Sequence, residues 1–200
     1  MKRFEARQSM RQWGRWAAGL VVALGLSVHA AAANIVINDS FETGDFTGWT
    51  LAGDSTFFDG VECPGVGLVP RGECDAFFGA FGSDDTLSQT LTTIAGAPYS
   101  IAFFFASDGG VVSHFSASFG GATLIDLVNP AASPYTLYSF TRTATGASTP
   151  LSFSFRDDTG FLRLDAVSVA VPEPATLGLI GIAVAAMGFG RRRAARVAVR

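Results

Sequence analysis

The chain has 200 residues, 48% of them hydrophobic, and a formal net charge of −3. The charge is unevenly divided, because residues 34–171 carry four arginines and fifteen acidic residues, which leave this part with a net charge of −11. Such an acidic segment would repel the phosphates of nucleic acid, so its charge argues against binding to DNA or RNA and leaves cations and neutral sugars as compatible partners.

The N-terminus predicts a secretory signal peptide over residues 1–33. Basic residues dominate the first fifteen positions, and an almost wholly apolar stretch follows at 16–28. Residues 28–30 (VHA) and 31–33 (AAA) both offer the small-x-small pattern of signal peptidase sites. The apolar stretch is short for a permanent anchor, so we expect export through the Sec translocon followed by cleavage by signal peptidase. An uncleaved N-terminal helix is the alternative.

Residues 34–170 predict one all-β domain, an antiparallel β-sandwich. The apolar residues recur with a period of two, and Gly, Pro, Asn and Asp separate the apolar segments at the spacing typical of a sandwich. No helix of useful length is expected. Strands are expected at residues 34–37, 87–91, 99–106, 114–119, 135–143, 151–155 and 161–169.

Phenylalanine supplies the expected core of this domain, which contains sixteen of the chain's eighteen Phe residues. Each buried Phe contributes roughly 1.5–3 kcal/mol of transfer free energy. The run Phe103-Phe104-Phe105 places adjacent rings on opposite faces of a strand, which favours a central strand that is covered on both sides.

Cys63 and Cys74 are the only cysteines, and both lie in the part of the chain that we expect to be exported. An oxidising compartment and the turn-forming residues between the two cysteines favour a disulfide. The alternative is a two-thiol metal site, which lacks further ligands because His114 is the only histidine of residues 34–171.

Residues 38–42 (NDSFE), with Trp49 shortly after, and residues 161–169 (FLRLDAVSV) resemble the first and last strands of galactose-binding-like jelly rolls, which include several carbohydrate-binding modules. The resemblance implies that these two strands lie side by side and that Glu42 and Asp165 hold a structural Ca²⁺. Carboxylates and backbone carbonyls suit Ca²⁺, although Ala166 stands where a second acid is common. The alternative is that Glu42 caps a turn and Asp165 accepts backbone hydrogen bonds.

Few residues are suited to catalysis. Ser113 precedes His114 in an expected strand, so the two side chains point to opposite faces and cannot form a nucleophile–base pair. The acid pairs at 84–85 and 157–158 have the chemistry of a glycosidase, but adjacent acids at strand ends are typical turn formers. We therefore expect a protein that is not an enzyme, with a secreted carbohydrate-active enzyme as the alternative.

Aromatic residues are the expected contacts if the domain binds sugar, because pyranose rings stack on aromatic faces. The candidates are Trp49, Tyr99, Tyr135 and Tyr138. Core packing is the commoner fate of such residues, so exposure of their rings decides between a binding module and a purely structural matrix protein.

The C-terminus combines a proline motif, an uncharged apolar stretch and an arginine cluster: Val171-Pro172-Glu173-Pro174, residues 175–190 and Arg191-Arg192-Arg193. The prolines keep the motif extended. As a helix, residues 175–190 would span roughly 24 Å, slightly less than the hydrocarbon core of a bilayer. The arginines predict that the end of this transmembrane helix, and residues 194–200 after it, stay in the cytoplasm.

In this order, the three features at 171–193 closely resemble the PEP-CTERM sorting signal of Gram-negative bacteria. The resemblance implies that the helix holds an exported protein in the inner membrane until an exosortase cuts near the motif, and that the protein then reaches the cell envelope or the exterior. It also implies an association with exopolysaccharide. The alternative is an ordinary C-terminal anchor. We thus expect an exosortase-sorted surface or matrix protein that binds exopolysaccharide.

Overall fold

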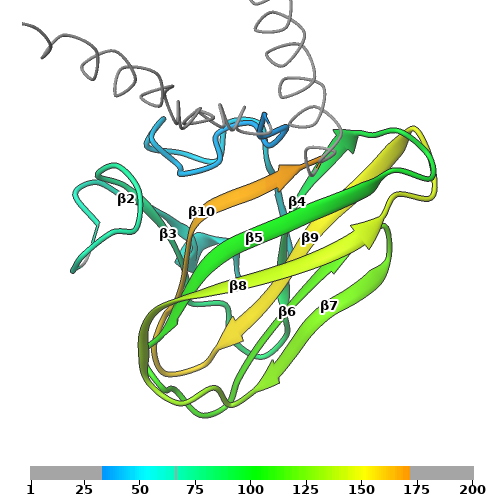
Figure 1. Cartoon of the computed structure of the whole chain (residues 1–200). Coiled ribbons are helices and arrows are strands. Elements are labelled where there is room, and N and C mark those ends of the chain that lie inside the picture. Colours follow the sequence, from blue (N-terminus) through cyan, green and yellow to red (C-terminus); the bar gives the residue numbers. More distant parts are fainter. Residues whose placement is uncertain (1–32, 66, 172–200) are drawn as a thin grey trace, which may run out of the picture. The chain divides into compact units, whose positions relative to one another are not determined.

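The computed structural model describes residues 33–65 and 67–171, which fold into two packed layers of β-strands (Figure 1). In chain order, the elements of this part are β1 (Thr50–Ala52), the 3-10 helix η1 (Thr56–Phe58), β2 (Gly60–Glu62), β3 (Asp75–Phe78), β4 (Asp85–Thr92), β5 (Pro98–Ser107), β6 (Ser113–Phe119), β7 (Ala122–Val128), β8 (Ser133–Thr143), β9 (Ser148–Asp157) and β10 (Leu162–Ala170).

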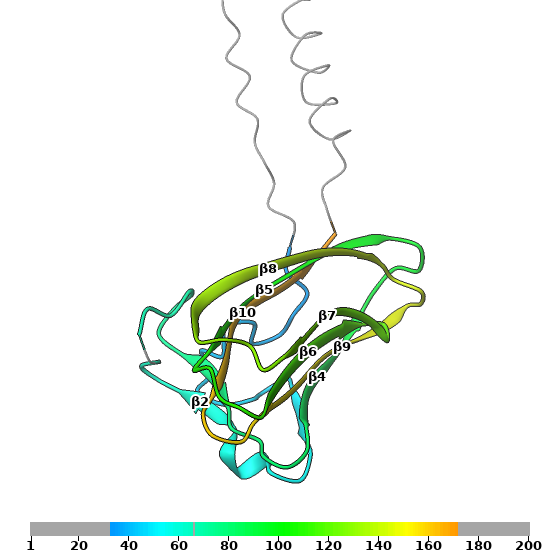
Figure 2. The ribbon, with the colours of Figure 1, turned by 90° about the horizontal axis from the view of Figure 1, so that it is seen from below.

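The strands form two five-stranded sheets in which every neighbouring pair is antiparallel. Sheet A has the order β1-β4-β9-β6-β7, and sheet B has the order β2-β3-β10-β5-β8. Figure 2 shows the two layers, with β8, β5 and β10 in one and β7, β6, β9 and β4 in the other. The predicted all-β antiparallel sandwich is confirmed.

The core lies between the sheets and is built from alternate residues of the long strands, as the period of two predicts. Phe105 of sheet B stacks on Phe115 of sheet A at a centroid distance of 4.1 Å. Within the Phe103-Phe104-Phe105 run, the first and third rings are buried, and Phe104 is half-buried on the opposite face of β5, where it pairs with Leu137. As predicted, β5 is an inner strand, between β10 and β8.

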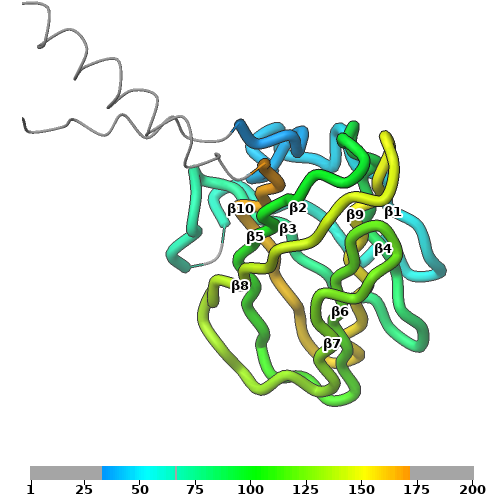
Figure 3. The backbone as a smooth tube through the Cα atoms, turned by 45° about the vertical axis from the view of Figure 1, so that its right-hand side comes forward, coloured from blue at the N-terminus to red at the C-terminus, as the bar shows by residue number. Residues whose placement is uncertain are grey.

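The first described residues lie along the last strand (Figure 3). The Ile35 N–H donates to the Val169 carbonyl (2.9 Å), and the Val169 N–H donates to the Asn34 side chain (2.9 Å). The prediction of a strand at 34–37 was wrong: one backbone bond joins the two segments, but the Asn34 side chain accepts the reciprocal bond from Val169. The expected contact between the first and last segments is nevertheless present.

Four short or amphipathic strands were missing from the sequence prediction: β1, β2, β3 and β7. Strands of three or four residues are too short to show a period of two, and their pairing with longer neighbours forms them. Within the described residues, no helix is long and apolar enough to cross a membrane. The signal peptide predicted at 1–33 and the sorting signal predicted at 171–193, with its transmembrane helix at 175–190, lie outside the described residues, apart from Ala33 and Val171.

Candidate functional site

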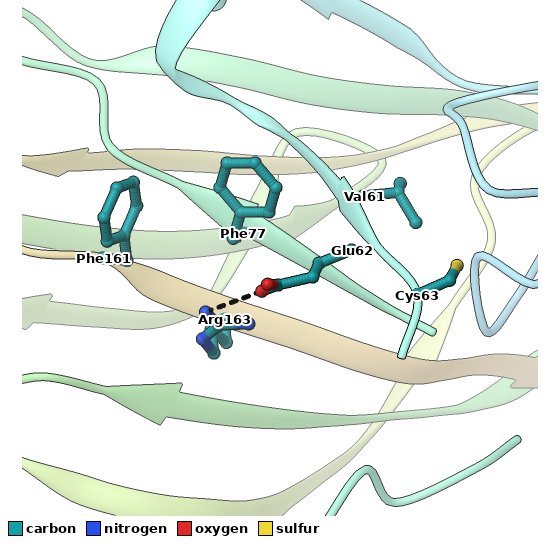
Figure 4. A pocket seen from close by; sticks show the side chains of 6 residues that line it. All are labelled: Val61, Glu62, Cys63, Phe77, Phe161 and Arg163. Carbon is teal, nitrogen blue, oxygen red and sulfur yellow. Dashed lines mark hydrogen bonds and ion pairs between the residues drawn. The ribbon is translucent and has the colours of Figure 1, made fainter. Parts of the chain in front are cut away.

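A shallow hollow of about 530 Å³ lies on the outer face of sheet B (Figure 4). The register between β3 and β10 forms this hollow. Arg163 of β10 pairs with Phe77 of β3 on the outer face, because their neighbours Leu162 and Phe78 face the core. The lining residues are Val61, Glu62, Cys63, Phe77, Phe161 and Arg163.

Two aromatic rings form the apolar wall of the hollow. Phe77 and Phe161 meet edge to face, with centroids 5.6 Å apart and an interplanar angle of 84°. Phe161 is 38% exposed, and Phe77 is partly exposed. Figure 4 shows both rings beside the Glu62–Arg163 contact. The hollow thus combines accessible aromatic surface with a polar floor.

Arg163 supplies the polar floor and is held by two acids. Its guanidinium donates to Asp75 (2.8 Å) and to Glu62 (3.2 Å). Asp75 is fully buried, and it also accepts a hydrogen bond from the Tyr135 hydroxyl. Burial and the negative charge of Asp75 raise the pKa of Tyr135 far above its ordinary value, so this hydroxyl stays protonated. The network fixes Arg163 beside the two rings.

The sugar-stacking candidates divide into three groups. Trp49 and Tyr99 are core residues, 8% and 2% exposed, so those two expectations were wrong. Tyr138 is half-buried and packs against Phe103 at a centroid distance of 5.8 Å. Tyr135 is the one of the four that lies near the hollow, and its hydroxyl is already bonded to Asp75.

Sequence reasoning missed the aromatic and charged residues that form the hollow. Phe77 lies in a four-residue strand, which is too short for the sequence pattern to reveal, and the pattern places Phe161 and Arg163 only in the last strand. The one available signal was Arg163 itself, an ionisable residue between Leu162 and Leu164 in an apolar alternation.

Cys63 and Cys74 form the predicted disulfide, with Cα atoms 4.4 Å apart. The cross-linked loop lies over sheet B, where the Arg71 N–H donates to Asp165 (2.9 Å). The Gly65 N–H closes the loop on itself by donating to the Glu73 carbonyl (2.8 Å).

The carboxylates of Glu42 and Asp165 both bind backbone of this loop. Glu42 accepts from the N–H groups of Glu73 and Cys74 (both 2.9 Å), and Asp165 accepts from those of Arg71 and Ala166. This is the alternative arrangement that the sequence left open. Across the described residues, no group of three or more His, Cys, Asp or Glu side chains is placed to hold a metal ion. Backbone N–H groups thus occupy both carboxylates, and calcium binding through Glu42 and Asp165 stays a prediction.

The acid pairs have structural roles. Asp85 and Asp157 are buried and organise loops: Asp85 accepts from the Asp54 N–H (2.9 Å), and Asp157 accepts from the Gly160 N–H (2.9 Å). Asp158 forms a two-bonded pair with Arg156 (both 2.7 Å), which holds the pKa of that carboxyl at about 2.

The remaining acid of these pairs, Asp84, contacts His114 on the outer face of sheet A. The other ring nitrogen of His114 faces Asp126 at 3.2 Å. Partial burial, the largest influence, lowers the pKa of His114, but the two carboxylates outweigh it and the net pKa is raised. Ser113 is buried on the opposite face of β6, as predicted, so His114 is not a base for that hydroxyl.

Comparison with known proteins identifies the C-terminal motif and the fold. Residues 170–194 match the PEP-CTERM protein-sorting motif, which marks an exported protein processed by an exosortase. The predicted sorting signal is thereby confirmed. A search of curated proteins gave no match to the sequence.

Among solved structures, TmCBM61 in complex with beta-1,4-galactotriose is similar with a TM-score of 0.54 and 19% identity, over 70% of this chain and 100% of that chain. A xylan-binding domain from CBM 22 gives a TM-score of 0.52 and 16% identity, over 70% of this chain and 96% of that chain. The enzymatically active domain of the bacteriophage CBA120 tailspike protein 4 gives a TM-score of 0.54 and 15% identity, over 70% of this chain and 21% of that chain. The shared fold is the jelly roll of carbohydrate-binding modules.

Proposed function

We propose that this exported, exosortase-processed chain is a non-enzymatic carbohydrate-binding protein that acts at the cell surface or in an extracellular polysaccharide matrix. The observation that carries the proposal is the hollow on sheet B, where the partly exposed rings of Phe77 and Phe161 flank an arginine fixed by two acids. The jelly-roll likeness to TmCBM61 and to the xylan-binding domain supports the proposal through the fold.

The chemistry of the hollow suits a sugar. A pyranose has an apolar face of C–H groups, which packs on an aromatic ring, and a rim of hydroxyls, which need fixed donors and acceptors. Phe77 and Phe161 offer the rings, and the partly exposed Glu62 carboxylate offers acceptors. Because Arg163 is already held by Asp75, little side-chain freedom is lost when a ligand binds.

The positions of the acids favour binding over hydrolysis. A glycosidase needs two accessible carboxyl groups on either side of the scissile bond. Glu62 lines the hollow, but its nearest acidic neighbour in the network, Asp75, is fully buried and paired with Arg163. If purified protein released reducing sugar from a polysaccharide that it binds, and Glu62→Gln abolished the release, the enzymatic alternative would hold instead.

Binding is tested with purified residues 34–171, which contain both sheets and the core of the described chain. Affinity electrophoresis against a panel of plant and bacterial polysaccharides should retard the protein in at least one gel. Phe161→Ala should weaken that binding by about tenfold, the effect of one stacked ring. Thr90→Ala, at an exposed position on sheet A, is the matched control and should bind normally. Equal affinity of both variants would contradict the hollow as the site.

Sorting is tested separately at the motif. In an exosortase-bearing host, the unaltered protein should appear shortened outside the inner membrane, and Glu173→Ala should accumulate at full length within it. The prolines of the Val171–Pro174 motif keep the chain extended, as a protease requires. If both versions kept Arg191–Arg193 and stayed in the inner membrane, the tail would be an ordinary anchor.

A further inference from the structure

An exposed group of aromatic rings lies next to the hollow, and we call it the aromatic tip: Phe57 and Phe58 of η1 with Phe81 of the loop before β4. Phe57 is 73% exposed, Phe81 is 52% exposed and Phe58 is 41% exposed. Phe58 packs against Phe57 (centroids 4.2 Å apart) and against Phe81 (5.6 Å). Three exposed phenylalanines in contact are an unusual surface for a soluble domain and indicate a binding site.

The aromatic tip is continuous with the hollow through Gly79. A methyl group at this glycine would lie 2.8 Å from the Phe161 ring and 3.4 Å from the Phe58 carbonyl oxygen. The Phe161 ring and the backbone of η1 therefore both lie against Gly79. The two ring pairs of the hollow and the aromatic tip are thus neighbours on the surface, separated by this one glycine, and we call the two groups together the aromatic path.

Buried hydrogen bonds hold η1 at both ends. Before the helix, the Ser55 N–H donates to the fully buried Asp85 (3.1 Å), and the Phe81 N–H donates to the Ser55 hydroxyl (3.1 Å). After the helix, Asp59 accepts from the Gly79 N–H (3.0 Å). The rings are thus presented on a fixed backbone, which lowers the entropy that a ligand must overcome.

The path has no free cation with which to bind an acidic ligand. Residues 34–171 contain no lysine, and three of their four arginines are paired with acids: Arg71 with Asp39, Arg156 with Asp158, and Arg163 with Asp75 and Glu62. Arg142, the fourth, pairs across the strands with Tyr99 at the start of β5, whereas Phe161 lies beside the end of β5. Since β5 has ten residues, the two ends are roughly 30 Å apart.

The acids near the path also disfavour an acidic ligand. Asp54 lies two residues before η1 and is exposed, and the Glu62 carboxylate is partly exposed at the hollow. A carboxylated or sulfated polymer would meet repulsion without a compensating arginine, whereas an uncharged sugar would lose nothing. The same acids disfavour an anionic lipid surface and a second copy of this chain.

From this continuity and charge, we propose that the hollow and the aromatic tip together bind an extended polysaccharide chain that carries no acidic groups. The inference rests on the proposed function and adds two properties to it: contact with several consecutive sugar units, and discrimination against acidic polymers. The hollow holds one part of the chain, and the rings of the aromatic tip hold the units that follow.

The test for length uses β-1,4-galacto-oligosaccharides from the monosaccharide to the hexasaccharide in calorimetric titrations, with both the full chain in detergent and residues 34–171. Affinity should rise by about tenfold or more between the disaccharide and the hexasaccharide. The double variant Phe57→Ala/Phe58→Ala should lose this rise and keep the disaccharide affinity, and Phe81→Ala should act in the same direction. Because all three side chains are exposed, an unchanged melting temperature should accompany both variants.

The test for charge compares polygalacturonate with the same polymer after chemical reduction of its carboxyl groups. The protein should bind the reduced polymer and not the acidic one. Three results would overturn the inference and leave sugar binding itself intact. They are tighter binding of the acidic form, an equal loss of affinity for short and long oligosaccharides in the aromatic-tip variants, and a change of oligomeric state in those variants. Binding neither to these saccharides nor to any polysaccharide of the panel would instead overturn the proposed function together with it.

Discussion

The two outer faces of the sandwich have the same number of strands and opposite chemistry. The face of sheet A carries hydroxyl residues, and one row of them crosses all five strands: Thr50, Ser88, Ser152, Ser118 and Thr123. The face of sheet B carries rings and aliphatic groups, among them Phe77, Phe104, Tyr135 and Leu137.

The charged groups differ between the faces as well. On sheet A, Arg156 and Asp158 form a partly exposed pair, whereas on sheet B Arg163 contacts the fully buried Asp75. Short hydroxyls are well solvated, and this row on sheet A offers no surface on which a sugar ring could stack. Sheet B has partly exposed aromatic surface and a desolvated ion pair, and these are the features of a binding face.

The largest expected effect on stability comes from removing Arg163 of sheet B, and Arg156 of sheet A provides the comparison. Arg163→Ala leaves the buried Asp75 without its counter-charge and should destabilise the domain by about 3–5 kcal/mol. Arg156→Ala removes a solvent-screened pair on sheet A and should change the free energy of unfolding far less than Arg163→Ala does. Urea unfolding of both variants measures the difference. Equal losses of stability would mean that the ion pairs of the two faces do not differ energetically. The double variant Arg163→Met/Asp75→Leu, which removes both charges, should recover much of the stability lost in Arg163→Ala.

Much of the fold could be predicted from sequence, because long strands carry a period of two. In residues 151–155 (LSFSF), apolar residues alternate with serine, which predicts the buried face. The strand β9 indeed buries the Leu and both Phe rings. The first segment could not be predicted in detail, since the Asn34 side chain replaces strand pairing there. Strands of three residues, such as β1 and β2, exist because a neighbour pairs with them.

The candidate site was harder to predict for a topological reason. Phe77 and Arg163 are far apart in the chain, and only the register of β3 on β10 brings them together. A one-residue shift of that register would send either side chain to the core face. The sequence did predict the sorting motif and the disulfide, because the residues of the motif are consecutive and the two cysteines have no other partner.

The disulfide should have the next largest effect, and it acts on the sheet B side. The loop from Cys63 to Cys74 covers that face through the contact of Arg71 with Asp165. Replacing both cysteines by serine should lower the free energy of unfolding by about 2–3 kcal/mol, because the unfolded chain regains loop entropy. Thermal melts with and without reductant measure it, and a variant as stable as the parent would show that the loop is held by hydrogen bonds alone.

A smaller effect should appear as a dependence of stability on pH. Burial, and then the nearby carboxylate of Asp85, raise the pKa of Asp59 to about 7, although a hydrogen bond from Gly79 opposes the shift. The folded state therefore holds a proton that the unfolded state releases at about pH 4, so stability should fall as the pH rises from about 4 to 7. With allowance for partial exposure, the loss is on the order of 1 kcal/mol.

Two variants assign this pH dependence to the two sides of the molecule. Asp59→Asn, beside β2 of sheet B, should flatten the slope between about pH 4 and 7. The raised pKa of His114 on sheet A stabilises the fold at low pH, and this contribution should be lost as the pH rises through the folded pKa. His114→Gln should therefore remove only the pH dependence above the ordinary histidine pKa of about 6.5. Melting temperatures measured across the range decide it, and an unaltered slope in both variants would contradict the assignment.

Calcium should have the smallest effect of all. The carboxylates of Glu42 and Asp165 already accept backbone N–H groups from the disulfide loop, and a cation would have to displace those donors. Melting temperatures in EDTA and in millimolar Ca²⁺ should therefore agree within about 1 °C. A melting temperature that rises with free Ca²⁺, and loses that rise in Asp165→Asn, would assign a cation to this pair, as the jelly-roll resemblance implies. In that case the loop over sheet B would be held by metal rather than by hydrogen bonds, and the contrast between the two faces would depend on calcium.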